Sequence, residues 1–214
     1  MRPLVILRPE PAASRSADLA RAMGLEVRVL PLFALEPVPW SAPHPANFDG
    51  LVLTSANAVR LGGNELRKLL ALPVHAVGAA TAAAAREAGF SVASIGEGGA
   101  RSMALPAGRL LHLAGRDHQS VGTAKTIITY EARPVALPEG IEDLRQSVVA
   151  VHSPRAGGRL AELIDHRSSI AVAAISPTAA EACSTGWKCV EAAGQPTDDA
   201  LLALAAGLCE RLAP

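Results

Sequence analysis

Two similar patterns of hydroxyl-bearing residues occur about a hundred residues apart in this chain. In each pattern, one apolar run ends at a serine and a second apolar run leads to a Thr-Ala pair. The serines are 98 residues apart and the threonines 97. A hydroxyl at the point where a strand turns into a helix caps that helix, and the free N–H groups of helix N-termini bind anions. The pattern therefore predicts four anion-binding helix ends, at Ser55, Thr81, Ser153 and Thr178.

The single tyrosine of the chain, Tyr130, stands 97 residues after Phe33. The same interval separates two further pairs, Pro37 with Pro134 and Gly89 with Gly186. A nearly constant offset indicates two copies of one α/β unit. Two interpretations of Tyr130 are open: an amphipathic residue that packs at a hinge, or a proton donor that breaks the symmetry of the repeat. Neither repeated serine lies in a G-x-S-x-G motif or near a His/Asp pattern, so we expect no nucleophile–base pair.

The composition excludes several classes of protein. Twenty basic and twenty acidic residues among 214 give a net charge of zero, without the basic patch of a nucleic-acid-binding protein. The three cysteines and six histidines lack metal-ligand spacing, and the odd number of cysteines favours a reducing compartment. No apolar run approaches the ~20 residues of a membrane span, and the N-terminus has no apolar signal core. We expect a cytoplasmic protein that binds no metal, nucleic acid or membrane.

Apolar runs of strand length alternate with helical patterns along the chain. Strands are expected at Pro3–Leu7, Glu26–Leu30, Leu51–Thr54, Val74–Val77, Ser91–Ile95, Arg109–Leu113, Thr126–Tyr130, Val148–His152, Ile170–Ala174 and Lys188–Val190. Helices are expected at Ser14–Met23, Asn57–Leu70, Thr81–Ala88, Arg155–Asp165, Thr178–Thr185 and Thr197–Arg211. The segment 96–108 is ambiguous. This alternation predicts an α/β fold with parallel sheets covered by helices on both faces.

Proline-marked extended segments predict the domain layout. They lie near 31–37 and 128–135 and read as two antiparallel linker strands that form a hinge. Residues 1–34 and 133–214 would then form one discontinuous domain, with 38–127 inserted as the other. A split near residue 107 into sequential halves stays open. If the two domains face each other, the helix N-termini ring one cleft that suits a ligand with several carboxylates.

Seven short stretches, in order along nearly the whole chain, are similar to one known family. They are V-I-L-R-P at Val5–Pro9, F-D-G-L-V-L-T-S-A-N-A-V at Phe48–Val59, A-V-G-A-A-T-A at Ala76–Ala82, L-L-H-L-A-G-R-D at Leu110–Asp117, I-T-Y at Ile128–Tyr130, H-S-P-R-A at His152–Ala156 and A-I-S-P-T-A at Ala174–Ala179. On these motifs the chain resembles uroporphyrinogen-III synthase. The resemblance implies two similar α/β/α three-layer domains of flavodoxin-like topology, joined by a two-stranded linker.

The resemblance also implies a reaction on a linear tetrapyrrole, hydroxymethylbilane, which carries eight carboxylates. Loss of its hydroxyl gives an azafulvene, and the last pyrrole ring attacks this centre, forms a spiro intermediate and recloses inverted. The resemblance implies no cofactor and no metal, and we expect a monomer. Tyr130 would assist departure of the hydroxyl. The implied substrate-binding residues are Ser55, Thr81, Ser153 and Thr178. We expect further substrate contacts from Arg8, Asn57, Arg116 and Arg155.

Three departures from the family pattern keep other functions open. Only His118–Lys125 follows Gly115-Arg-Asp117 where the family carries a full helix, the segment 96–106 is short, and Ser176-Pro177 replaces the usual Gly-Pro. A second hypothesis is therefore a non-catalytic, two-lobed sensor of small molecules. A third is a generic two-lobed anion-binding protein, which the missing signal core disfavours.

Overall fold

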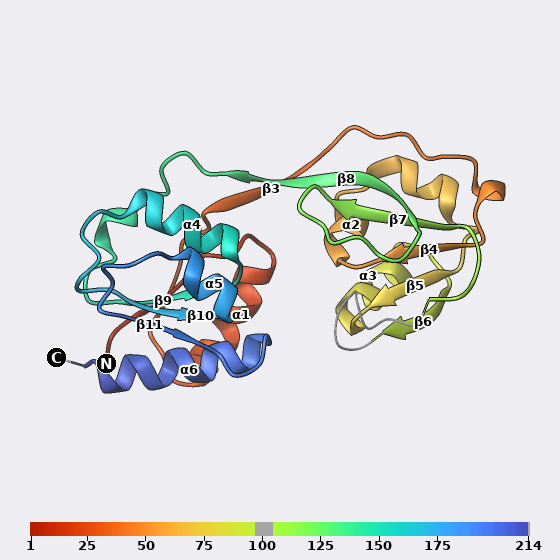
Figure 1. Ribbon diagram of the computed structural model, residues 1–214. Helices are drawn as coiled ribbons and strands as arrows, with labels where there is room; N and C mark the ends of the chain where they lie inside the picture. Colours follow the sequence, from red (N-terminus) through yellow and green to blue (C-terminus); the bar gives the residue numbers. More distant parts are fainter. Residues whose placement is uncertain (97–104, 214) are drawn as a thin grey trace. The chain divides into compact units, whose positions relative to one another are not determined.

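A computed structural model of the chain describes residues 1–96 and 105–213 (Figure 1). The described chain forms two compact units. Unit 1 consists of Met1–Ala34 and Arg133–Pro214, and unit 2 consists of Leu35–Ala132. Each unit is built on its own sheet. The alternation of strands and helices in the sequence thus produces the expected α/β fold with parallel sheets.

Unit 1 holds a five-stranded parallel sheet in the order β11-β10-β9-β1-β2. Its strands are β1 (Leu4–Ile6), β2 (Val27–Val29), β9 (Val148–Val151), β10 (Ala171–Ala174) and β11 (Cys189–Ala192). Its helices are α1 (Ala12–Ala22), α4 (Pro154–Leu163), α5 (Pro177–Ala182) and α6 (Asp198–Arg211). The three central strands are fully buried, as expected where helices cover both faces of a parallel sheet.

Each face of this sheet packs against a different pair of helices. Alternate side chains of β1, β9 and β10 form a core with α1 and α6, while α4 and α5 pack together over the other face (Figure 1). Gly157 permits the close approach of α4 to α5, because a Cβ there would lie 2.8 Å from the carbonyl oxygen of Ala179. Unit 1 is therefore the expected three-layer α/β/α structure.

Unit 2 holds a six-stranded sheet in the order β3-β8-β7-β4-β5-β6. Its strands are β3 (Phe33–Pro37), β4 (Gly50–Leu53), β5 (Val74–Val77), β6 (Val92–Gly96), β7 (Leu110–Gly115) and β8 (Lys125–Pro134). Its helices are α2 (Ala56–Arg60), α3 (Ala79–Glu87) and the 3₁₀ helices η1 (Pro45–Asn47) and η2 (Gly63–Leu69). The main core packs α2, η2 and α3 on one face. Within the described residues, the other face carries only a small cluster of Val52, Leu110 and Val121.

The two sheets have the same spatial arrangement but are entered by the chain at different strands. In unit 1 the order β2-β1-β9-β10-β11 corresponds to β8-β7-β4-β5-β6 in unit 2. Numbered along the chain within each unit, these orders are 2-1-3-4-5 and, with β3 left out of the count, 5-4-1-2-3. Only unit 1 therefore has the flavodoxin-like order. The sheets of the two units are therefore related by a circular permutation: the strands have the same spatial order, but the chain passes through them from a different starting strand.

The strands β3 and β8 form the ladder that both proline-marked segments predict. Val38 N–H donates to the carbonyl of Thr129, and Val135 N–H donates to the carbonyl of Leu32, each at 2.9 Å. As the residue number rises on β3 it falls on β8, so the pair is antiparallel. The two hydrogen bonds are related by the same 97-residue offset as Phe33 and Tyr130. The repeat therefore extends into the ladder itself.

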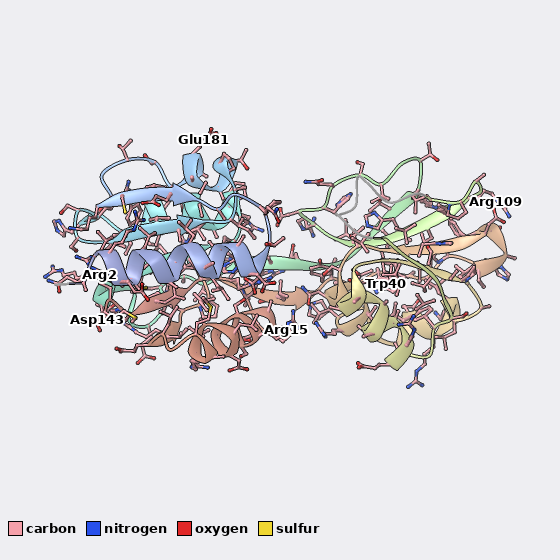
Figure 2. All side chains as sticks on the ribbon, turned by 90° about the horizontal axis from the view of Figure 1, so that it is seen from below. Arg2, Arg15, Trp40, Arg109, Asp143 and Glu181 are labelled. Carbon is pink, nitrogen blue, oxygen red and sulfur yellow. The ribbon has the colours of Figure 1, made fainter. Side chains whose placement is uncertain are left out.

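The single helix expected over Asn57–Leu70 is wrong. The α-helix in this region, α2, ends at Arg60, and the 3₁₀ helix η2 follows it. A continuous helix is interrupted because Gly63 has a φ of +65°, outside the helical range. At Gly62 a Cβ would lie 2.6 Å from the carbonyl oxygen of Ala58. The Trp40 indole, labelled in Figure 2, donates to the carbonyl of Gly62 at 2.9 Å. The ambiguous segment 96–108 and the short segment 96–106 lie largely outside the described residues.

Candidate functional site

A hollow of about 390 Å³ opens at the carboxyl end of the sheet in unit 2. It is lined by Thr54, Ser55, Gly115, Asp117, His118, Gln119 and Tyr130. These residues follow β4, end or follow β7, or lie on β8. β4 and β7 are the neighbours between which the strand order reverses, and open α/β sheets bind their ligands at this switch point. The hollow is therefore the main candidate site in unit 2.

Tyr130 lies against the end of β7. A Cβ on Gly115 would lie 2.6 Å from Cζ and 2.9 Å from the hydroxyl oxygen of Tyr130. The ladder between β7 and β8 has a register irregularity at Gly115, which pairs with Tyr130. Arg116 N–H also donates to the carbonyl of Tyr130 at 3.0 Å. The absence of a side chain at Gly115 therefore permits the phenol to reach the hollow.

Ser55 lies in the same hollow and caps α2. Its backbone is extended, and its Oγ accepts a hydrogen bond from the N–H of Asn57 at 3.2 Å. The preceding residue, Thr54, contacts Nε2 of His112 through its hydroxyl at 3.1 Å. Tyr130 and Ser55 thus line the same hollow.

Two histidines lie behind and within the hollow. His112 is fully buried between the hydroxyls of Thr54 and Thr126. Burial, followed by the charge of nearby His118, lowers the pKa of His112 to about 4, so its ring is neutral at physiological pH. The two imidazole rings meet edge to face at 5.7 Å between centroids. Nδ1 of His118 lies 3.0 Å from the carbonyl oxygen of Gly115, and because a carbonyl only accepts, this nitrogen carries the proton.

Arg116 is exposed and its charge has a carboxylate partner. Its Nε lies 2.5 Å from Oε2 of Glu131, and its side chain is 58% exposed.

Four residues that line the hollow were not predicted from the sequence: Thr54, Asp117, His118 and Gln119. Their position directly after β4 and β7 was the available signal, because parallel strands present ligand-binding residues at their carboxyl ends.

Arg8, at the carboxyl end of β1 in unit 1, belongs to a partly buried polar network. Its Nη1 lies 3.2 Å from Oδ1 of Asp198 and 3.1 Å from Oγ of Ser16. The Ser16 hydroxyl donates to Asp198 at 2.6 Å, and Nε2 of His152 lies 2.9 Å from the same carboxylate. Burial acts to raise the pKa of Asp198, but the hydrogen bonds from His152 and Ser16 and the charge of Arg8 lower it to about 2. The Arg8 charge is thus balanced within unit 1.

Three further candidates lie at the carboxyl end of the unit 1 sheet. Ser153 caps α4 by accepting from Ala156 N–H at 3.1 Å. The Arg155 guanidinium lies 4.5 Å from the centroid of the Phe33 ring, which is a cation–π contact. The hydroxyls of Thr178 and Ser176 lie 3.0 Å apart at the start of α5.

The expected capping roles of Thr81 and Thr178 are wrong. α3 is preceded by Gly78 and α5 by Ser176, whose Oγ accepts from Ala179 N–H at 3.3 Å. These two cap positions are 98 residues apart, so the threonines, which are 97 apart, are not structurally equivalent. Thr81 is buried inside α3, whereas Thr178 is exposed. The serine that departs from the family pattern, Ser176, is therefore the cap.

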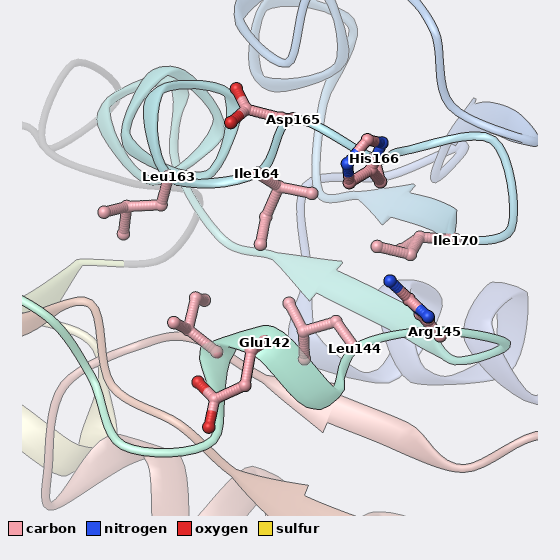
Figure 3. Close-up of a pocket in the computed structure, with 9 residues that line it drawn as sticks. Glu142, Leu144, Arg145, Leu163, Ile164, Asp165, His166 and Ile170 are labelled. Carbon is pink, nitrogen blue, oxygen red and sulfur yellow. The ribbon is translucent and has the colours of Figure 1, made fainter.

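A second hollow, of about 220 Å³, lies in unit 1, at the end of the sheet opposite the carboxyl ends of its strands (Figure 3). Ile141, Leu144, Ile164 and Ile170 line it with apolar side chains, and Arg145 and His166 lie near Ile170 on one side. It lies beside the amino ends of β9 and β10. None of the residues singled out from the sequence lines it. The described residues contain no group of three or more His, Cys, Asp or Glu side chains that could hold a metal ion, and no described helix is long and apolar enough to cross a membrane.

Doubly wound sheets with a polar hollow at a switch point are typical of α/β proteins that bind small molecules. A family model described as uroporphyrinogen-III synthase HemD matches residues 14–203. The chain therefore belongs to the uroporphyrinogen-III synthase family, which confirms the resemblance seen in its motifs.

Solved structures support the same fold. Uroporphyrinogen-III synthetase from Helicobacter pylori is similar with a TM-score of 0.66 and 18% identity, over 97% of this chain and 100% of that one. A mutant uroporphyrinogen III synthase from the extremely thermophilic bacterium Thermus thermophilus is similar with a TM-score of 0.51 and 18% identity, over 98% of each chain. A comparison with curated protein sequences gave no match.

Proposed function

We propose that this chain is a uroporphyrinogen-III synthase, a cyclising lyase of tetrapyrrole (haem) biosynthesis. It would convert hydroxymethylbilane into uroporphyrinogen III with loss of water and inversion of the terminal pyrrole ring. One observation carries the proposal: the chain matches the family over residues 14–203. In support, Tyr130 and Ser55 line one hollow.

Tyr130 is the proposed catalytic residue. Its phenol would donate a hydrogen bond to the departing hydroxyl, and the C–O bond would break with its electron pair on oxygen. The last pyrrole ring then attacks the azafulvene, and the spiro intermediate fragments and recloses. Because the bilane closes spontaneously to the uninverted isomer, the main task of the protein is to impose a conformation. The hydroxyls and backbone N–H groups of the site serve that task.

The remaining candidates, with the exception of Thr81, are proposed to bind substrate carboxylates. In unit 2, Ser55 and Asn57 stand at the start of α2, and in unit 1, Ser153, Arg155 and Thr178 stand at the carboxyl end of the sheet. Arg8 and Arg116 already have protein carboxylates as partners, so each would exchange a partner on binding. Thr81 is buried and would contribute by packing α3.

We also propose a domain organisation and an oligomeric state for the chain. We infer that units 1 and 2 act as two domains with hinge segments near 31–37 and 128–135. We further infer that the enzyme is a cytoplasmic monomer. Light scattering on the purified chain measures the number of copies per particle, and a dimer mass would contradict the inferred state.

An isomer assay tests the function. The full chain is mixed with freshly generated hydroxymethylbilane, and the uroporphyrinogen isomers are separated after oxidation. We expect the inverted isomer III at a rate well above spontaneous closure. If only the uninverted isomer forms, at the rate seen without protein, the chain is not a synthase and the sensor hypothesis takes its place.

A further inference from the structure

We propose that His118 is a proton-exchanging residue of the unit 2 hollow, which delivers the proton that turns the departing hydroxyl into water. This inference rests on the proposed function. It concerns a residue in the shortened segment after β7, where the chain departs from the family pattern.

The first support is the shared position of His118 and Tyr130. Both line the same hollow of about 390 Å³, and both contact Gly115, one through its ring and one through the Gly115 carbonyl. The phenol and the imidazole therefore converge on one residue at the end of β7. A substrate hydroxyl that fits between them would meet two donors, a phenol and an imidazole.

The second support is the fixed tautomer of His118. Since Nδ1–H donates to the Gly115 carbonyl, the other ring nitrogen, Nε2, is the one that gains and loses a proton. The side chain is exposed at the hollow. Proton transfer therefore changes the charge of the ring without breaking its anchoring hydrogen bond.

The third support is the difference in chemistry between the two donors. A phenol has a single O–H, whereas an imidazolium carries an N–H on each ring nitrogen and can release one proton while the other nitrogen keeps its hydrogen bond. The phenol is thus suited to a hydrogen bond, and the imidazolium is suited to supply a proton. The neighbouring His112 is excluded from that task because it is fully buried between two threonine hydroxyls.

The fourth support is the crossover that carries His118. β7 and β8 are parallel, and only residues 116–124 connect them, without a helix. The corresponding crossover of unit 1, from β1 to β2, carries α1. A short loop replaces the helix and brings Asp117, His118 and Gln119 to the wall of the hollow.

The proposed proton transfers balance over one turnover. The proton on Nε2 passes to the hydroxyl oxygen, the C–O bond breaks with its electrons on oxygen, and water leaves. The imidazole is then neutral. When the closed macrocycle loses a ring-carbon proton, Nε2 takes it and returns to its starting state. The net change is loss of one water molecule.

Groups from three segments face His118. His112 faces it from β7 as a neutral ring, Tyr130 faces it from β8, and Asp117 precedes it in the loop. The pair Arg116–Glu131 lies next to this wall and balances its own charge. Because the protonated form is the active one in this proposal, we expect kcat to fall as the pH rises.

The decisive variant is His118→Asn, since the asparagine amide keeps a donor for the Gly115 carbonyl but does not titrate. We expect kcat at neutral pH to fall about 100-fold, the lower end of a positioned proton transfer, with a flat pH profile and little change in KM. His166→Asn, at an exposed histidine of unit 1, is the matched control and should retain the wild-type profile. An unchanged kcat and pH profile in His118→Asn, or a change in KM alone, overturns the proposal.

A binding measurement separates this proposal from the proposed function. In full-length protein labelled with ¹⁵N-histidine, uroporphyrinogen III under reducing conditions should shift the Nε2 resonance of His118 more than that of His166. If the wild-type chain forms only the uninverted isomer, the proposed function fails by the isomer assay, and the proton-delivery role fails with it. An unmoved His118 resonance in an active wild-type chain overturns the inference about His118 alone.

Discussion

Gly115 fixes the place of the Tyr130 phenol, because the ring occupies the space where any side chain at that position would stand. A Cβ on this glycine would lie 2.6 Å from Cζ of Tyr130, well inside van der Waals contact. The glycine carbonyl also anchors His118. A residue without a side chain therefore positions both groups of the hollow that are proposed to act on the departing hydroxyl.

At the residue scale, Tyr130→Phe should lower kcat about 10- to 100-fold, because the ring is kept and only the hydroxyl is lost. Stability should change little, since the hydroxyl faces the hollow while the ring packs against the main core of unit 2. Steady-state kinetics and urea unfolding of the full chain measure the two effects. A variant with wild-type turnover would remove Tyr130 from the mechanism.

Gly115→Ala is the companion to that change. The new methyl group displaces the far end of the Tyr130 side chain, so activity should fall although the tyrosine is still present. Wild-type activity in this variant would mean that the position of the phenol does not matter. Gly158→Ala is the matched control, because a Cβ there meets nothing within 4 Å.

At the element scale, the start of α6 is bound to the rest of unit 1 through one carboxylate. Asp198, the first residue of α6, accepts from Ser16 of α1 and pairs with Arg8 and His152. The network therefore links α6 to α1 and to the residues that follow the central strands β1 and β9. This network accounts for the position of Arg8 in the folded chain.

Asp198→Asn should lower the free energy of unfolding by about 1–2 kcal/mol at neutral pH, because it leaves Arg8 without its charge partner. The folded pKa of Asp198 is lowered to about 2, below the unfolded value of ~3.9. Its stabilisation is therefore present above pH ~4 and is lost as the pH falls toward ~2. Urea unfolding across this range should show a smaller acid loss in the variant than in the wild type.

Asp199→Asn provides the control for that experiment. Asp199 is exposed and lies in the same first turn of α6, so its replacement removes an equal charge from the helix terminus. The effect should be a few tenths of a kcal/mol. Equal losses in the two variants would contradict a specific role of the network around Asp198.

At the scale of the whole molecule, the two units differ in how their sheets are covered. In unit 1, α1 and α6 cover the face opposite α4 and α5. In the described part of unit 2, the corresponding face carries the small cluster of Val52, Leu110 and Val121. Among the described residues, less apolar surface is buried on that face, which gives less stabilisation from the hydrophobic effect.

We therefore expect unit 2 to unfold at lower urea than unit 1. Hydrogen exchange of the full chain, followed by mass spectrometry at increasing urea, should show β7 losing protection before β9. Peptides from α6 provide the internal reference for unit 1. Loss of protection in both units at one urea concentration would show that they unfold as a single cooperative unit.

Much of the fold was predictable because it depends on local patterns. Short apolar runs and glycine stops located the strands and most helices, for example β1, β9 and α6. The helix expected from Asn57 to Leu70 failed because two glycines with special geometry interrupt it. The capping role of Thr81 failed because α3 already begins after Gly78, so Thr81 lies inside the helix and is buried.

The sequence by itself determined the family, the α/β class and the candidate tyrosine, since these follow from motif order and from the alternation of apolar runs. Only the tertiary structure decided which residues share the hollow. Thr54, His118 and Tyr130 come from three separate segments, and strand order alone makes them neighbours. It also decided the circular permutation between the units, because pairing between strands is a non-local property that no local pattern encodes.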